Sequence, residues 1–164
     1  MTLTTHAVIA AAITRPLMRA HPALILLVGI ATHYLSDAVP HWDYGVRSLV
    51  QKDTQKKRLN WYGGTAKRDF LWIIGDFIVG FSLVYLWVRP HSREEFLWVI
   101  FSVAGGMLPD LLQGINLSLK SQPLRPLQKL HDFFHTRIKL GRYPLFGIPF
   151  QLAIYALFTW LLVK

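Results

Sequence analysis

The chain has 164 residues, enough for one domain, and 52% of them are hydrophobic. The mean hydropathy of +0.32 is too high for an ordinary soluble domain of this size. The absence of cysteine excludes disulfides and thiolate metal sites, so any metal ion must be bound by histidine, carboxylate or water.

The apolar residues come in blocks that approach the ~20 residues needed to cross a ~30 Å hydrocarbon core. They do not alternate with period two, so helices are expected to cross the membrane. We predict an all-α, integral-membrane bundle of about five spanning helices plus a short amphipathic helix, in a single domain. In chain order its elements are a helical hairpin over 4–39, a basic loop over 44–68, a second helical hairpin over 69–116, an amphipathic helix over 124–139 and a final span over 144–163.

The net charge of +9 is concentrated in two long loops. Thirteen Lys and Arg residues lie within 44–69 and 115–143, whereas the turns at the opposite ends of the helices carry four. Because cytoplasmic loops are rich in Lys and Arg, we predict a multi-pass protein of the inner (cytoplasmic) membrane with these loops in the cytoplasm. Nucleic acid could also balance the charge. Loops that flank spans face lipid headgroups, however, so we expect membrane lipid, in particular anionic phospholipid, as the partner and no nucleic acid.

The most informative motif lies at the end of the first hairpin. His33, Asp37 and His41 follow one another at intervals of four residues, which places side chains on one helix face. Pro40 is expected to bend or end the helix, so that His41 and Asp43 fold back over the same corner. Ionisable groups at the edge of a bilayer cost several kcal/mol each unless they are paired or coordinated. The motif therefore indicates a functional site.

The two hairpins resemble a weak internal repeat. The first helix of each begins near a polar residue, His6 or Asp76, and the second ends in an aspartate beside a proline, Asp37 or Asp110. In an antiparallel hairpin the start of one helix lies beside the end of the next, so we expect His6 near Asp37 and Asp76 near Asp110 on the cytoplasmic side. Membrane transporters also use duplicated helical units, so the repeat alone does not indicate an enzyme.

A late pair, His131 and His135, has the i,i+4 spacing with which one helix offers two imidazoles to one metal, although the Glu of the zincin signature is absent. The predicted metal ligands, all histidines or aspartates, are His6, His33, Asp37, Asp76, Asp110, His131 and His135. This thiolate-free set suits one or two Zn²⁺ ions, or Mn²⁺ or Fe if carboxylates dominate. A binuclear site would clamp a phosphoryl or acyl oxygen and activate a water, with His41 or Asp43 handling the proton.

Several candidates also have an interpretation without metal. His6 could cap the first helix at the interface, and His33 could make a hydrogen bond in the core. Asp76 could serve a proton relay or pair with Arg68.

His41 and Asp43 could belong to a solvated loop. The pair His131 and His135 could face lipid headgroups on a surface helix.

These residues resemble those of a known family. Thr5-His6, the stretch from Thr32 to Asp43, Leu108-Pro109-Asp110 and the late histidine pair are similar to the predicted inner-membrane metal-dependent hydrolases. The stretch from His33 to His41 is also similar to the pattern of zinc-dependent phospholipase C, an all-helical fold with a polynuclear zinc site.

The resemblance implies metal ligands at His33 and Asp37, and further ones at His6, Asp110 and His135. The chain lacks the Glu ligand and the N-terminal Trp of the phospholipases. The His-Arg-x-x-Thr-His-Ser element of the membrane family is reduced to residues 134–137.

The sequence thus favours an integral-membrane, metal-dependent hydrolase that acts on a lipid-like ester, in the first place a phosphoester, at the cytoplasmic membrane interface. The alternative is a non-enzyme: a metal- or proton-translocating membrane protein, or a scaffold whose His/Asp cluster is structural.

Overall fold

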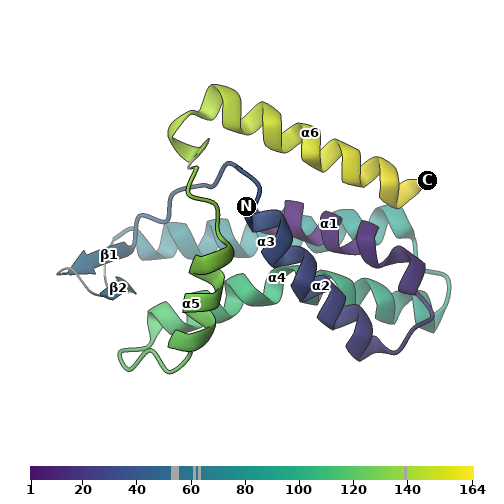
Figure 1. The fold of residues 1–164 in the computed structure, drawn as a ribbon, viewed down its shortest axis with the longest axis horizontal. Helices are drawn as coiled ribbons and strands as arrows, with labels where there is room; N and C mark the ends of the chain where they lie inside the picture. The colour runs from purple at the N-terminus through teal and green to yellow at the C-terminus, as the bar shows by residue number, and fades with distance from the viewer. Residues whose placement is uncertain (53–55, 61, 63, 139) are drawn as a thin grey trace.

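The computed structural model describes residues 1–52, 56–60, 62, 64–138 and 140–164. Within these residues the fold is mainly helical, as predicted, with one two-stranded sheet (Figure 1). The elements are α1 (Leu3–Thr14), η1 (Arg15–Leu17), α2 (Pro22–Asp37), β1 (Leu49–Lys52), β2 (Lys56–Leu59), α3 (Ala66–Val88), α4 (Arg93–Ser118), α5 (Arg125–Phe134), η2 (Leu140–Arg142) and α6 (Pro144–Val163).

Helix α1 is the centre of the bundle. It packs against α2, α3, α4 and α6, and nine of its twelve residues are buried. Alanines at 7, 10 and 11 let the neighbouring helices approach closely. The helix stops at Thr14 because Pro16 has no N–H to continue the ladder, and Arg15–Leu17 forms a 3₁₀ turn instead. The indole of the fully buried Trp98 in α4 donates to the carbonyl of Thr14 at 3.1 Å and fixes this end.

Three glycines hold α4 in backbone contact with α1 and α2. A Cβ added at Gly105 would lie 2.6 Å from the carbonyl oxygen of Leu26, and one added at Gly29 would lie 3.0 Å from the Cα of Gly105. A Cβ at Gly106 would lie 2.7 Å from the carbonyl oxygen of His6. Helices α1 and α2 therefore both pack on the stretch of α4 that immediately precedes Asp110.

Three described helices, α3, α4 and α6, are long and apolar enough to cross a membrane. Large apolar side chains on α3 and α6 are exposed, Leu86 to 59% and Phe146 to 74%, as expected for surfaces that face lipid. The first two predicted spans are too short. Helix α1 has 12 residues and α2 has 16, which at ~1.5 Å per residue reach about 18 and 24 Å, less than the ~30 Å core.

Residues 44–68, predicted to form a loop, contain a short β-hairpin that projects from one end of the molecule (Figure 1). Strands β1 and β2 pair antiparallel, with Leu49 opposite Leu59. The strands are only four residues each and carry several charges, so their period-two pattern was too weak to indicate a strand. Residues 53–55 of this predicted loop lie outside the described residues.

Helix α5 is shorter than the predicted amphipathic helix over 124–139. It ends at Phe134, and the next residue, His135, has extended backbone angles. The chain then crosses the end of α2, where the N–H of Thr136 donates to the carbonyl oxygen of Asp37 at 2.8 Å. Residue 139 lies outside the described residues. The final helix begins at Pro144 and ends at Val163, as predicted.

Candidate metal centre

Eight of the nine candidate side chains lie together where α1 begins, α2 ends and α5 crosses α4. The ion-pair distances that connect them join His6, His33, Asp37, His41, Asp43, Asp110, His131 and His135. The predicted proximity of His6 and Asp37 is confirmed: Nε2 of His6 lies 3.1 Å from Oδ1 of Asp37.

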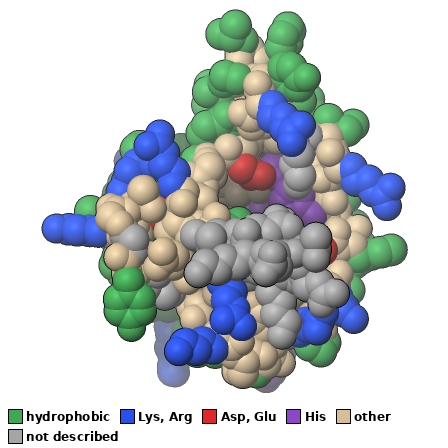
Figure 2. All heavy atoms as spheres, turned by 90° about the vertical axis from the view of Figure 1, so that its left-hand side faces the viewer, with side chains coloured by type: hydrophobic (Ala, Val, Ile, Leu, Met, Phe, Trp, Pro, Cys, Tyr) green, Lys and Arg blue, Asp and Glu red, His purple; other side chains and the backbone are tan. Residues whose placement is uncertain are grey.

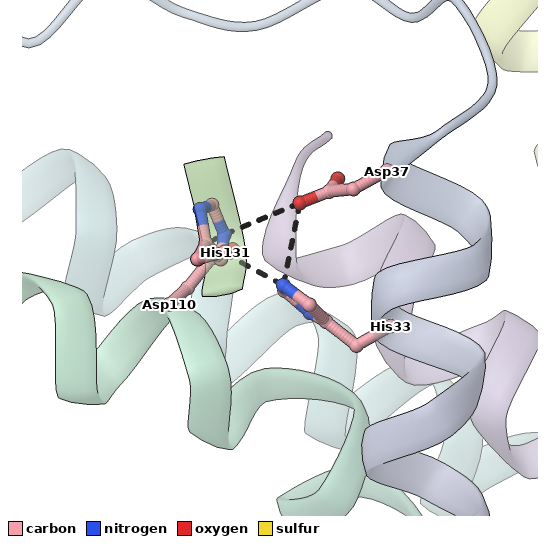
Figure 3. A group of neighbouring side chains, drawn as sticks. All are labelled: His33, Asp37, Asp110 and His131. Atoms are coloured by element: carbon pink, nitrogen blue, oxygen red, sulfur yellow. Dashed lines mark hydrogen bonds and ion pairs between the residues drawn. The ribbon is translucent and has the colours of Figure 1, made fainter. Parts of the chain in front are cut away.

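One group within this cluster could hold a metal ion: His33, Asp37, Asp110 and His131 (Figure 3). Nε2 of His33 and Nε2 of His131 each lie 3.3 Å from Oδ2 of Asp37. The same nitrogens lie 3.7 and 3.2 Å from Oδ1 of Asp110. Ligand atoms at about 2.0–2.1 Å from a tetrahedral zinc ion are about 3.3–3.4 Å apart. Three of these four distances are close to that spacing, and all four atoms lie within 4.8 Å of one another.

A second group, Asp37, His41 and His135, shares one carboxylate with the first. Oδ2 of Asp37 faces the first group, and its Oδ1 lies 3.7 Å from Nε2 of His41. Asp43 lies at the edge of this group, with Oδ2 3.3 Å from Nε2 of His41 and 3.8 Å from Nε2 of His135. Asp37 is thus placed where its two oxygens could bridge two ions.

The other ring nitrogen of each central histidine makes an orienting hydrogen bond. Nδ1 of His33 donates to the carbonyl of Gly106 at 2.7 Å, and Nδ1 of His41 donates to the carbonyl of Val39 at 2.7 Å. The hydroxyl of Ser36 donates to the carbonyl of His33, so it accepts from Nδ1 of His6 at 3.0 Å. Since a carbonyl can only accept, these contacts place the ring proton on Nδ1.

The result is a set of three buried nitrogens without a hydrogen-bond partner, namely Nε2 of His6, His33 and His41. In a neutral ring each carries a lone pair, and each faces a carboxylate oxygen that also only accepts. A cation between them removes the repulsion. Protonating His6 is unfavourable, because burial and the ring of His33, stacked on it at 4.0 Å, lower the pKa of His6 to about 4. The donor set therefore fits a metal ion, with Nδ1 hydrogen-bonded as in metal-binding histidines generally.

The pKa shifts of two side chains outside the apolar helices also show that the cluster favours positive charge. Burial lowers the pKa of His131, but the carboxylates of Asp110 and Asp37 outweigh burial and raise that pKa to about 9. Burial raises the pKa of Asp43, but His41 and the amino group of Met1 outweigh burial and lower it. That amino group lies 2.6 Å from Oδ1 of Asp43 and 3.2 Å from Oδ1 of Asp37. The carboxylates of the cluster thus attract cations from several directions.

Asp76 is the candidate that the structure places elsewhere. Its carboxylate accepts hydrogen bonds from the N–H of Leu3 at 2.7 Å, the N–H of Thr4 at 3.0 Å and the hydroxyl of Thr4 at 2.6 Å. Asp76 therefore holds the first turn of α1, which carries His6, and it is in neither metal-capable group. The alternative partner, Arg68, lies instead beside Asp69, with Nη1 3.8 Å from Oδ1.

Sequence reasoning missed the residues that orient the histidines. The amide of Gln113 lies 3.0 Å from Nδ1 of His131, and Ser36 contacts His6. Gln113 follows Asp110 by three residues and Ser36 follows His33 by three, so each shares a helix face with a candidate ligand. That spacing was the signal that could have identified them.

The cluster is partly open to solvent: the side chains of Asp43 and Asp110 are 39% and 24% exposed, whereas its central side chains, such as Asp37, are buried. Figure 2 shows a hollow in which acidic and histidine side chains are visible, with Lys and Arg side chains on several sides of it. A positively charged rim around a metal-capable site favours an anionic ligand.

Comparisons with protein-family models, with curated proteins and with solved structures found no significant match. The structure itself provides a metal-capable His/Asp cluster in a helical bundle, three of whose described helices could cross a membrane.

Proposed function

We propose that this chain is an integral-membrane, metal-dependent hydrolase that cleaves a lipid-like phosphoester at the cytoplasmic membrane interface. The observation that carries the proposal is the set of three buried Nε2 atoms, of His6, His33 and His41, that face carboxylates and have no hydrogen-bond partner. Buried polar atoms are normally satisfied, so orphaned nitrogens that converge on acceptors are typical of ligands.

The proposed metal is Zn²⁺. His33, Asp37, Asp110 and His131 would hold one ion, and Asp37, His41 and His135 would hold a second, with His6 beside Asp37. Mixed imidazole and carboxylate ligands without thiolate suit zinc. Ions bound there would supply Lewis acidity toward a phosphoryl oxygen and would acidify a water molecule.

The chain's own residues supply the other requirements. The side chain of Asp43 is 39% exposed and lies 3.3 Å from Nε2 of His41, so this carboxylate is placed to carry a proton between the cluster and solvent. The Lys and Arg side chains around the hollow would hold the negative charge of a phosphoester. Three helices capable of crossing a membrane would keep the site at a lipid surface.

The test combines metal analysis with turnover. Bound metal is measured in the purified wild type and in the variants His33→Ala and Asp37→Ala. The control is His91→Ala, because His91 is exposed and remote from the cluster. Each is then assayed on phosphatidic acid and phosphatidylglycerol in mixed micelles.

We expect stoichiometric zinc and phosphoester cleavage in the wild type and in the control. Asp37→Ala should lose all zinc and cleavage, and His33→Ala should lose cleavage and the ion of the first group. A wild type without stoichiometric metal would contradict the proposal. Bound metal without cleavage of either lipid would favour a translocating protein or a scaffold. Uptake of zinc or protons into liposomes would then distinguish the translocating protein from the scaffold.

A further inference from the structure

A groove of about 880 Å³ lies between the segment 42–46 and one face of α3. This volume is within the range of about 300–1,000 Å³ that is typical of ligand sites. Its lining includes Trp42 and Tyr44 on one side and Leu71, Trp72 and Val79 on the other. The groove is separate from the metal-capable groups, because none of its lining residues belongs to either of them.

The wall formed by α3 is apolar and open. Leu71 and Trp72 are each 58% exposed and Val79 is 49% exposed. Positions 68, 72, 75 and 79, which all line the groove, recur at intervals of three and four and therefore share one helix face. Because α3 is long and apolar enough to cross a membrane, this face is continuous with a surface that hydrocarbon would cover.

The opposite wall leads to the His/Asp cluster. Trp42 lies between His41 and Asp43 in the chain, so its backbone joins the groove to the second metal-capable group. Thr2 also lines the groove, and the amino group of the preceding residue, Met1, lies 2.6 Å from Oδ1 of Asp43 and 3.2 Å from Oδ1 of Asp37.

Three charged side chains line the groove, namely Arg68, Asp69 and Asp76. Arg68, in the first turn of α3, lines one end and its side chain is 44% exposed. Lys and Arg side chains also flank the hollow above the cluster (Figure 2). Both aspartates already accept backbone hydrogen bonds, Asp69 from Ser48 and Asp76 from the start of α1. The exposed guanidinium of Arg68 stands beside the apolar, lipid-continuous wall, where it can contact a negatively charged headgroup attached to a hydrocarbon chain.

We propose that this groove binds one hydrocarbon chain of an anionic lipid whose headgroup reaches the His/Asp cluster, a role that rests on the membrane hydrolase proposed above. The lipid enters sideways from the bilayer along α3, its chain lies between Trp42 and Trp72, and its phosphate faces the cluster. A substrate without a chain gains nothing from the groove, so the groove selects lipid phosphoesters over soluble ones.

Gly75 allows a direct test. It lines the groove, and a Cβ added there meets nothing within 4 Å, so we expect the larger side chain of Gly75→Leu to extend into the groove with the backbone unchanged. Gly114→Leu is the matched control. A Cβ at Gly114 also meets nothing within 4 Å, and this residue is likewise inside a long helix but does not line the groove.

The probe is phosphatidic acid with a diazirine midway along one acyl chain, in phosphatidylcholine nanodiscs that contain the full chain. After irradiation, mass spectrometry measures labelling of residues 42–46 and the metal content is measured in parallel. We expect labelling that saturates and that unlabelled phosphatidic acid competes away. It should be roughly tenfold weaker in Gly75→Leu, because an added side chain occupies the site, and unchanged in Gly114→Leu.

Labelling that does not saturate, or that excess phosphatidic acid leaves unchanged in the wild type, would mean contact with bulk lipid only and would overturn the groove assignment. Equal labelling of Gly75→Leu and wild type would overturn it as well. Saturable, Gly75-sensitive labelling of a chain without metal would support the groove while contradicting the hydrolase. Bound zinc and phosphoester cleavage, together with equal labelling of Gly75→Leu and the wild type, would support the hydrolase and contradict the groove.

Discussion

Nε2 of His33 lies 3.3 Å from Oδ2 of Asp37, one helical turn later in α2, and yet it has no hydrogen-bond partner. Nδ1 of the same ring donates to the carbonyl of Gly106, so Nε2 presents a lone pair to an oxygen that cannot donate. The last turn of α2 therefore holds an imidazole and a carboxylate in the relative position that a shared cation requires.

The bridging position of Asp37 predicts unequal effects of removing single ligands. Asp37→Ala should lose both ions, since its carboxylate belongs to both metal-capable groups. His135→Ala should retain the ion of the first group and lose that of the second. Zinc counted per chain after dialysis checks this prediction. Loss of both ions in His135→Ala, or retention of both in Asp37→Ala, would contradict two groups that share one carboxylate.

Metal affinity should fall with decreasing pH. In the metal-free protein the pKa of His131 is raised to about 9, so below that pH the ring carries a proton that a metal must displace. Each unit of pH below about 9 should therefore weaken the apparent zinc affinity roughly tenfold through this group. Competition with a chromophoric chelator at several pH values measures the slope. In His131→Gln the slope should be shallower by about one proton, and an unchanged slope would contradict this role for His131.

The variant Asp76→Ala distinguishes two roles for Asp76, a cap at the start of α1 and a metal ligand. Asp76 accepts hydrogen bonds from Leu3 and Thr4 at the start of α1, and losing such a cap costs about 0.5–2 kcal/mol. We expect a Tm lower by a few degrees with zinc stoichiometry retained.

Asp76→Asn, which keeps an acceptor oxygen, should recover part of the stability, and Asp132→Ala on the exposed face of α5 should change neither property. Loss of zinc in Asp76→Ala, with α1 still folded by circular dichroism, would instead make Asp76 a ligand.

Close packing of α1 on α4 should control the geometry of the site. A Cβ at Gly106 would lie 2.7 Å from the carbonyl oxygen of His6 and 2.8 Å from the Cβ of Ala10, so Gly106→Ala must push the helices apart. Overpacking of this kind costs typically about 1–3 kcal/mol. We expect lower thermal stability and weaker zinc binding. Gly114→Ala, where a Cβ meets nothing, should be neutral or slightly stabilising in the same assays.

Local patterns in the sequence predicted most helix positions and most of the cluster. The i,i+4 spacing of His33 and Asp37 and the proline after them place both side chains on one face at a helix end, and the hairpin comparison placed His6 beside Asp37. These inferences need only helical geometry and proline chemistry, which are local.

The remaining features depend on packing between distant segments. The hairpin comparison expected Asp76 beside Asp110, but Asp76 contacts the backbone of α1, because α1 packs on α3 as well as on α2 and α4. The hydrophobicity of α1 resembles that of a short span, and only the contacts of all its faces show it to be the core of the bundle. The groove likewise forms between α3 and a loop that no periodic pattern describes.

The central claim is that the His/Asp cluster binds metal, and elemental analysis of the purified full chain tests it most directly. After loading with Zn²⁺ and extensive dialysis, we expect about two zinc ions per wild-type chain, one for each metal-capable group, with the same value in His91→Ala and none in Asp37→Ala. A wild-type chain that retains no stoichiometric metal, or an Asp37→Ala chain that retains as much as the wild type, would contradict the account.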